Sequence, residues 1–272
     1  MTYVVAVSGG VDSIVLLDMM VRSKDASIVV AHFDHGIRDD SHEDADFVAA
    51  VAESYGLVFE TRREELGANA GEALARARRY LFLREIAKKY DAELVTAHHA
   101  DDMVETVAIN LLRGTGWRGL AVLDSGDLRP LIKTQKKDIL AYALQHNLEW
   151  REDSTNHSNR YLRNRVRPAV KALSTNSKNQ LQLLRDEQIV IKNAIHDEVY
   201  KLFGDGPQYS RYVLTHVSRQ VAIECLRVIT NGSLTRPQLA RLLLAIKTMP
   251  DGRTYEAGAG VVVRFDTRNF YL

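Results

Sequence analysis

The sequence predicts an α/β fold, with a parallel-sheet domain over residues 1–170 followed by a smaller, mostly helical domain over residues 171–272 that ends in short strands. Short β-branched runs alternate with helical stretches as far as about residue 146, and such alternation is typical of a parallel sheet with helices on both faces. Polar loops follow the first, second and fourth of these runs. The alternation stops near Trp150, where the composition changes and one long amphipathic stretch follows.

Strands and helices are expected to alternate in the first domain. The apolar, β-branched runs that predict strands are residues 3–7, 27–33, 57–61, 93–97 and 128–132. The patterns that predict helices begin at about residue 14 and then cover residues 41–55, 72–89, 101–113 and 134–146. Ligands of parallel sheets bind beyond the carboxyl ends of the strands. We therefore expect the loops after the first, second and fourth strands to share one edge and to form a site.

The second domain is expected to begin with a long helix. Helical patterns cover residues 178–203, 218–230 and 237–247, and short strands follow at residues 253–257, 261–265 and 270–272. An apolar stripe runs along the last helix, at Leu239, Leu242, Leu243 and Ile246. Such a stripe usually faces the core of its own domain, so we favour a core position over a dimer seam and leave a homodimer open.

Composition narrows the class of protein. Of the 272 residues, 46% are apolar and 26% are charged, as in ordinary globular proteins. No run approaches the ~18 apolar residues of a membrane helix, and a strand that begins at residue 3 leaves no room for a signal segment. Cys225 is the only cysteine, which fits a reducing compartment, so we expect a cytoplasmic protein without a membrane partner. With a net charge of +1, a nucleic-acid-binding chain must concentrate its basic residues locally.

The loop after the first strand is suited to an anion. It consists of Ser8, Gly9, Gly10, Val11, Asp12 and Ser13. Unpaired backbone N–H groups and the start of a helix together favour a phosphate, and the two glycines let it approach without a Cβ in the way. The spacing matches neither the phosphate loop that ends in Gly-Lys-Ser/Thr nor the dinucleotide motif, and no lysine follows. We expect a nucleotide phosphate here, and the alternative is a plain glycine turn.

A cluster of acids follows the fourth strand. Asp101, Asp102 and Glu105 share one side of the helix expected there. The helix dipole explains an acid at a helix start, but it explains the pairing with Glu105 less well. Three acids beside a phosphate loop repel a nucleotide unless a cation lies between them, such as a magnesium ion or an amine. The neighbouring His98 and His99 leave a zinc site as a weaker alternative, because the chain offers no nearby cysteine and the spacing is unfamiliar.

Two basic segments are candidates for binding a polyanion. Arg76 and Arg79 fall on one side of the third expected helix, together with Tyr80. This pattern suits an arginine clamp on a phosphate or nucleobase, and a solvated basic face explains it equally well. Residues 151–171 hold six basic residues against two acids, interleaved with asparagine. We expect this segment to bind a nucleic-acid backbone, through Arg160, Arg163, Arg165 and Arg167.

In their order along the chain, these motifs resemble those of the tRNA(Ile)-lysidine synthases, a family of PP-loop ATP pyrophosphatases with an adenine nucleotide alpha hydrolase-like fold. The segments that carry the resemblance are SGGVDS, AHFDHGIR, EALARARRY, TAHHADDMVET, LLRGTGWRGL, RPLI and DSTN…YLRNRVRP. They cover residues 1 to about 170, and the tail matches more loosely. Asp34 stands where a second histidine is common, and Met103 occupies a commonly polar position. The length resembles that of a short form, without the further C-terminal domain of longer members.

The resemblance implies a carbon–nitrogen ligase that uses ATP with Mg²⁺. In the first step, ATP adenylates the C2 oxygen of the wobble cytidine in the CAU anticodon of tRNA(Ile), and pyrophosphate is released. In the second step, the amine of free L-lysine displaces AMP and forms lysidine, which changes decoding from AUG to AUA. The implied partners are therefore tRNA(Ile) and free lysine.

The resemblance also assigns roles to residues. The loop of residues 8–13 is the implied ATP site, and Asp12 is the candidate ligand of Mg²⁺ or pyrophosphate. The implied catalytic or substrate-binding residues are Asp12, Arg76, Arg79, His99, Asp101, Asp102 and Glu105. Arg76 is expected to contact phosphate or cytidine in the transition state, where fixed positive charge counts most. One carboxylate is expected to accept a proton from the attacking amine, and which acid binds the ammonium stays open.

Three other functions stay open. A tRNA thiolase uses the same scaffold, but such enzymes generally need cysteines near the loop, and Cys225 is far from it in sequence. An ATP-dependent amidotransferase, such as an NAD or GMP synthetase, explains the loop but neither the arginine helix nor the basic segment. A nucleotide-binding regulator without turnover can carry the same loop, and pyrophosphate release stimulated by tRNA distinguishes an enzyme from it.

Overall fold

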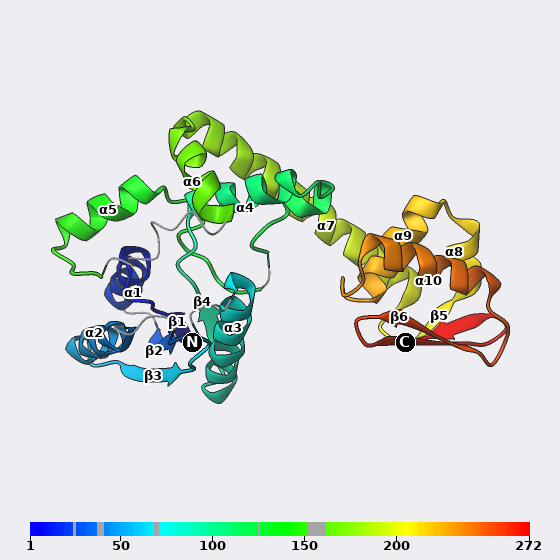
Figure 1. Cartoon of the computed structure of the whole chain (residues 1–272), viewed down its shortest axis with the longest axis horizontal. Helices are drawn as coiled ribbons and strands as arrows, with labels where there is room; N and C mark the ends of the chain where they lie inside the picture. The colour runs from blue at the N-terminus through cyan, green and yellow to red at the C-terminus, as the bar shows by residue number, and fades with distance from the viewer. Residues whose placement is uncertain (24–25, 37–40, 68–70, 125, 152–161) are drawn as a thin grey trace. The chain divides into compact units, whose positions relative to one another are not determined.

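The computed structural model describes residues 1–23, 26–36, 41–67, 71–124, 126–151 and 162–272 (Figure 1). These residues form two compact units, Met1–Gln188 and Ile189–Leu272. The sequence placed the domain boundary at residue 170, whereas the units divide inside helix α7 (Thr175–Phe203). The first part of α7 belongs to unit 1 because Leu181 packs beside a small core that α4 (Ala100–Leu112) and α6 (Leu162–Ala172) build together.

Unit 1 is built around a four-stranded sheet. Its strands are β1 (Thr2–Ala6), β2 (Ser27–Asp34), β3 (Val58–Arg63) and β4 (Glu93–Val95). The order across the sheet is β3-β2-β1-β4, and every neighbouring pair is parallel. The further helices are α1 (Val11–Ser23), α2 (Ser41–Ser54), α3 (Glu72–Lys89) and α5 (Lys136–Gln145), with a 3-10 turn, η1 (Trp117–Leu120). The parallel α/β architecture expected from the sequence is confirmed.

Helices cover both faces of this sheet, because successive side chains of a strand point to opposite sides. On one face, Val5 and Val30 pack with apolar residues of α1, α2 and α5. On the other face, Val4 and Val29 pack with Phe82 of α3. The nearly continuous apolar runs of β1 and β2 reflect this burial on two sides.

A buried carboxylate fixes α1 against its neighbours. Asp18 accepts hydrogen bonds from the hydroxyl groups of Tyr55 and Tyr142, both at 2.8 Å, and from Nε of Arg22 at 2.7 Å. Burial alone raises the pKa of Asp18, but these hydrogen bonds outweigh it and hold the pKa below its ordinary value. Tyr55 follows α2 directly and Tyr142 lies on α5. The one carboxylate therefore joins three helices on this face of the sheet.

The prediction of a strand at residues 128–132 is wrong. Within this segment, which the structure describes in full, Leu128 alone pairs with the sheet, as a parallel bridge to Val95 of β4. Its N–H and C=O make backbone hydrogen bonds of 2.8 and 2.9 Å. The pairing stops there because Pro130 has no N–H group and cannot extend a ladder.

Several short or basic elements were not predicted from the sequence. Helix α6 lies in the segment that was treated only as basic, although Leu162, Val166 and Val170 recur at helical spacing. The arginines between them and Pro168, inside the helix, concealed this pattern. The 3-10 turn η1 follows the helix expected at residues 101–113, in a stretch for which no element was predicted. Strand β5 (Gln208–Ser210) and helix α8 (Arg211–His216) were too short to predict.

Unit 2 joins the rest of α7 to short helices and a second sheet. Its further elements are α9 (Arg219–Ile229), α10 (Arg236–Thr248), β6 (Thr254–Gly258), β7 (Val261–Phe265) and β8 (Asn269–Tyr271). The sheet is antiparallel, in the order β5-β8-β7-β6. The apolar stripe of α10 is buried in the core of this unit, as expected. Among the helices that the structure describes, none has the length and apolarity needed to cross a lipid bilayer.

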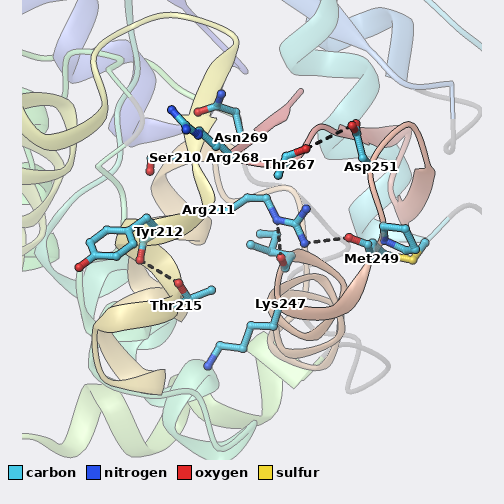
Figure 2. Close-up of a pocket in the computed structure, with 12 residues that line it drawn as sticks. Ser210, Arg211, Tyr212, Thr215, Lys247, Met249, Asp251, Thr267, Arg268 and Asn269 are labelled. Atoms are coloured by element: carbon cyan, nitrogen blue, oxygen red, sulfur yellow. Dashed lines mark hydrogen bonds between the residues drawn. The ribbon is translucent and has the colours of Figure 1, made fainter.

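Arg211 ties three parts of unit 2 together (Figure 2). Its guanidinium donates hydrogen bonds of 2.8 Å to the carbonyl oxygens of Ile246 and Met249, near the end of α10, and of Asp266, after β7. The last carbonyl groups of a helix have no partner within it, and a planar guanidinium with five N–H donors can serve several at once. Arg211 also lines a hollow of about 740 Å³, together with Lys247.

Replacing Arg211 by lysine should weaken unit 2 and leave unit 1 unchanged. A lysine ammonium cannot span the three carbonyl groups, so we expect the free energy of unfolding of unit 2 to fall by about 2 kcal/mol. Hydrogen–deuterium exchange of α8 to α10 in the full chain measures this loss. Tryptophan fluorescence reports unit 1 separately, because Trp117 and Trp150 both lie there.

The matched control is Arg264→Lys, at an exposed position of β7, for which we expect a change within about 0.5 kcal/mol. Equal exchange rates in Arg211→Lys and the parent chain would show that the three carbonyl groups do not depend on the guanidinium.

Candidate active site

The loop after β1 is closed by hydrogen bonds of its own serines. The hydroxyl of Ser13 donates to the carbonyl of Gly10 at 2.8 Å and accepts from the N–H of Ser8 at 3.2 Å. Gly9 has a φ of +89°, a backbone conformation that residues with a Cβ rarely adopt. Helix α1 begins at Val11, within this segment, and the N–H groups of Ser13 and Ile14 donate to the carbonyl of Gly10 at 3.0 and 3.1 Å. The N-terminus of the helix adds a partial positive charge at the turn. The arrangement is suited to binding an anion.

The loop after β4 leads into a capped helix. His99 is the N-cap of α4, and its Nδ1 accepts a hydrogen bond from the N–H of Asp101 at 3.2 Å. The carboxylate of Asp102 accepts in return from the N–H of His99 at 3.1 Å. This reciprocal pair is a capping box, with histidine in the place usually taken by serine or threonine. One acid of the cluster therefore has a local role in starting the helix.

The two loops meet, as the sequence led us to expect. Nε2 of His99 lies 3.7 Å from Oδ1 of Asp12 and 3.5 Å from Oδ2 of Asp102. His99 therefore stands between the first turn of α1 and the first turn of α4. The pairing of β1 with β4 explains this contact, because neighbouring parallel strands end at the same edge of the sheet.

The arginines of α3 face the same loop. The guanidinium carbon of Arg76 lies 4.9 Å from the centre of the Tyr80 ring, and that of Arg79 lies 5.6 Å from it. Burial holds the pKa of His98 well below its usual range, and Arg76 and Arg79 lower it further, against the opposing charge of Asp102. His98 is therefore neutral, and the positive field of α3 reaches the start of α4. The sequence left open whether this face is only solvated, and the pKa of His98 shows that the charges of Arg76 and Arg79 act on the loop after β4.

Two lysines that sequence analysis missed hold acids of the site. Nζ of Lys136, at the start of α5, lies 2.6 Å from Oδ1 of Asp12. The backbone N–H of Lys136 donates to Oδ2 of Asp101 at 2.9 Å, and Nζ of Lys178, on α7, pairs with Oδ1 of Asp101. Burial alone raises the pKa of Asp101, but these two lysines outweigh it and lower the pKa. Asp101 thereby joins α4, α5 and α7.

Glu105 is enclosed by arginines of α6. Nε of Arg167 lies 3.0 Å from its Oε1, and Nε of Arg163 lies 3.3 Å from its Oε2. Arg163 also donates to the hydroxyl of Thr106 at 3.2 Å. Burial raises the pKa of Glu105 even though Arg167 and Arg163 pull it down. Two arginines expected to bind tRNA thus turn toward the acid cluster, whereas Arg165, between them, is exposed.

Asp102 differs from the other two acids. Among the residues that the structure describes, its ion-pair and hydrogen-bond partners are the imidazole and backbone N–H of His99, with no lysine or arginine in ion-pair distance. Burial alone raises the pKa of Asp102, but the imidazole and backbone N–H of His99, together with the charge of Arg163, outweigh it and lower the pKa. Asp102 is therefore an ionised carboxylate without a cationic side chain of its own.

The second strand ends in contacts that are structural. Asp34 accepts from the N–H of Gly36 at 2.8 Å and from Arg63 of β3 at 3.0 Å. Nδ1 of His32 lies 2.8 Å from the carbonyl oxygen of Val7. Residues 37–40, which include part of one motif, lie outside the described residues. The end of β2 is thus anchored to Val7, after β1, and to Arg63 of β3.

The described histidines of this edge are engaged in hydrogen bonds. Nδ1 of His98 lies 2.9 Å from the hydroxyl of Thr96, and Nδ1 of His99 accepts from a backbone N–H. Across the described residues, no three histidine, cysteine, aspartate or glutamate side chains gather as a metal site requires. Asp12 by itself fits Mg²⁺, since this ion is commonly held by one or two carboxylates together with substrate phosphates. Its carboxylate stands beside the anion-binding turn and is 30% exposed.

The basic segment is only partly placed. Arg160 lies outside the described residues, as does the DSTN motif before it. Arg151, which sequence analysis did not select, donates its backbone N–H to the carbonyl of Gly9 at 3.0 Å. Its guanidinium pairs with Glu43 at 2.6 Å and Asp44 at 2.7 Å. This residue fixes the turn after β1 to the start of α2, and nothing in the local sequence pattern indicates such a long-range contact.

Comparison with known proteins agrees with this geometry. Residues 1–173 match a family model described as a PP-loop domain. A tRNA(Ile)-lysidine synthase from Bacillus cereus (strain ATCC 14579) is 43% identical over 188 residues, which are 62% of this chain and 39% of that protein. One from Orientia tsutsugamushi (strain Boryong) is 30% identical over 294 aligned positions, covering 96% of this chain and 67% of that protein. The chain thus spans about two fifths of the length of the Bacillus relative and two thirds of the Orientia relative.

Among solved structures, the chain is similar to the U34-tRNA thiolase NcsA from Methanococcus maripaludis with its [4Fe-4S] cluster. The TM-score is 0.60, with 17% sequence identity over 70% of this chain and 71% of that one. At this identity the likeness concerns the fold alone, and it agrees with the parallel sheet of unit 1.

Proposed function

Because the chain belongs to the PP-loop family, and to the tRNA(Ile)-lysidine synthase group within it, we propose that it ligates free L-lysine to C2 of the wobble cytidine in the CAU anticodon of tRNA(Ile). In this proposal the chain is a carbon–nitrogen ligase of tRNA modification, which consumes ATP and releases AMP and pyrophosphate. The observation that carries the proposal is the meeting, at one sheet edge, of an anion-binding turn, a basic helix and an ionised carboxylate. A cytoplasmic location, expected from the lone cysteine, fits such a substrate.

The turn of residues 8–13 binds the phosphates of ATP in this proposal, and Asp12 holds Mg²⁺ between the turn and the nucleotide. Support comes from the N-terminus of α1, which begins within this turn, and from the left-handed conformation of Gly9. Arg76 and Arg79 stabilise the negative charge that develops when the C2 oxygen of cytidine attacks the α-phosphate. Their field already lowers the pKa of His98, which precedes the acid cluster.

Asp102 binds the ammonium groups of the substrate lysine. The sequence did not separate the roles of the three acids, but their partners differ. Asp101 and Glu105 already pair with cationic side chains of the protein, Lys178 and Arg167 among them. Asp102 is ionised, and among the described residues its ion-pair partner is the imidazole of His99 rather than a lysine or arginine. In this assignment Asp101 and Glu105 position α4, and a carboxylate accepts the proton of the attacking amine.

The tRNA is bound by exposed basic residues of both units. Arg165 points to solvent between two arginines that are engaged with Glu105, so it is the arginine of α6 best placed to contact a phosphate. Unit 2 adds exposed basic residues such as Lys247 and Arg268 around the hollow beside Arg211 (Figure 2). Contacts of this kind are independent of sequence and weaken as salt concentration rises.

The rival functions have less support. Cys225 is buried in the core of unit 2, whereas a thiolase needs cysteines beside the nucleotide loop. An amidotransferase leaves the position of Arg76 and Arg79 at the site without a role. A regulator without turnover does not require the ionised Asp102 next to a phosphate site, since a fixed negative charge there weakens nucleotide binding unless a cationic substrate accompanies it.

Mass spectrometry of the tRNA tests the proposed reaction. We expect a tRNA(Ile) transcript with a CAU anticodon, incubated with the chain, ATP and lysine, to gain the mass of one lysine residue on the anticodon cytidine. Omitting lysine should leave no such gain, and a tRNA(Met) transcript with the same anticodon tests selectivity. An unchanged cytidine, with the full-length folded chain and all three substrates present, would contradict the proposal.

Replacing Asp102 by asparagine should weaken the binding of lysine and leave the binding of ATP nearly unchanged. The asparagine side chain can still accept from the N–H of His99 and cap α4, but it loses the charge that binds an ammonium. Loss of one charge-assisted hydrogen bond corresponds to an increase of about ten- to a hundred-fold in the KM for lysine. The KM for ATP should change less than about twofold.

The matched control is Asp138→Asn, an exposed acid in the first turn of α5, which should leave both constants unchanged. A parental KM for lysine in Asp102→Asn would remove Asp102 from the lysine site, and an equal rise in the KM for ATP would indicate a structural role instead.

A further inference from the structure

The anion-binding turn contains no lysine, yet the structure supplies one from elsewhere in the chain. Phosphate loops that end in Gly-Lys-Ser/Thr place an ammonium on the phosphates from within the loop itself. Here Lys136, which is 124 positions from Asp12, brings its Nζ to 2.6 Å from Oδ1 of that residue. An ammonium thus stands at the edge of the turn, although it begins a different helix.

The backbone at Lys136 is held firmly. Helix α5 packs on α1 through Ile139 and Ala143, and the hydroxyl of Tyr142 donates to the buried Asp18 of α1 at 2.8 Å. The N–H of Lys136 itself donates to Asp101 at 2.9 Å. The position of this residue relative to the turn is therefore fixed by contacts that do not involve its ammonium.

The ammonium, in contrast, is free to change partners. The side chain of Lys136 is 36% exposed and that of Asp12 is 30% exposed. An ion pair this open to water is weak, and long lysine side chains reorient easily. By comparison, the pair of Lys178 with Asp101 is 11% exposed on both sides. The structure thus contains one buried lysine that joins helices and one accessible lysine beside the nucleotide loop.

We propose that Lys136 is a phosphate-contacting residue of the reaction, whose ammonium exchanges Asp12 for the β- and γ-phosphate oxygens when ATP enters. The inference rests on the proposed function, because it concerns the same ATP site. In the adenylation step, a bond forms between the C2 oxygen of cytidine and the α-phosphorus, and the bond from that phosphorus to the bridging oxygen breaks. Pyrophosphate leaves with the electron pair, and the ammonium of Lys136 offsets the charge that it gains.

A purely electrostatic explanation competes with this one. Lys136 could act only by neutralising Asp12, whose bare carboxylate repels phosphate. The two explanations differ once Asp12 is itself neutral. If Lys136 contacts phosphate, its replacement still lowers the affinity for ATP in an Asp12→Asn background. If Lys136 only neutralises Asp12, its replacement has no effect on that affinity there.

The experiment is a double-mutant cycle on ATP binding, measured by isothermal calorimetry with Mg²⁺ and the full chain. Lys136→Met should lower the affinity for ATP at least tenfold in the parent background, and at least tenfold in the Asp12→Asn background as well. Lys136→Arg should recover part of the affinity, since it keeps the charge. Lys137→Met is the matched control, because Lys137 is the adjacent, exposed lysine of the same helix, and it should bind ATP as the parent does.

Thermal unfolding accompanies each titration and shows that the variants are folded. Folded Lys136→Met should gain less thermal protection from ATP than the parent does, in proportion to its lost affinity. Unchanged ATP affinity in Lys136→Met, or a loss that vanishes in the Asp12→Asn background, would overturn the inference. These measurements need neither tRNA nor lysine. If the parent chain fails to form lysidine, that result contradicts the proposed function but does not decide whether Lys136 contacts phosphate.

Discussion

The parallel pairing of β1 with β4 is the contact on which the rest of the site depends. Its register places Val5 beside Val95, so the chain leaves both strands at the same edge of the sheet. After β1 it turns through Gly9 into α1, and after β4 it turns through His99 into α4. Two helices therefore begin side by side, and the partial positive charge of both N-termini acts on one space. A phosphate bound there needs no arginine in the turn itself.

Burial of carboxylates at this edge imposes the second constraint. A carboxylate removed from water is costly unless charges or hydrogen bonds compensate it, and the three acids of α4 are compensated in three ways. Asp101 pairs with a lysine of α7, Glu105 with arginines of α6, and Asp102 with the backbone and imidazole of its own helix cap. The first two arrangements attach α6 and α7 to the sheet edge. The third leaves a negative charge that an incoming amine can match.

Local chemistry explains what the sequence predicted well. The alternation of apolar runs with helices and the stripe on α10 each depend on neighbouring residues, and each was found. The meeting of residues 8–13 with residues 98–105 also followed, because the rule for parallel sheets converts strand order into position. The capping box of α4 was within reach too, since Asp102 follows His99 by three positions.

Long-range pairing explains what the sequence did not predict. Lys136 lies 124 positions from Asp12, and Lys178 lies 77 positions from Asp101, so no spacing rule connects them. The arginines of α6 were assigned to a polyanion because they are basic, but two of them satisfy Glu105 once α6 packs on α4. The expected strand at residues 128–132 was predicted from its apolar residues alone. It does not form because Pro130 stops the pairing that Leu128 begins.

The central claim is that one nucleotide lies where β1 and β4 end. A crystal structure of the full chain with Mg²⁺ and an ATP analogue methylated at the α,β-bridge tests it directly. The account predicts phosphate oxygens within hydrogen-bond distance of the backbone N–H groups of residues 10–13, with the α-phosphate facing Arg76 and Asp102. A nucleotide bound in unit 2, or one whose phosphates lie away from the turn after β1, would contradict it.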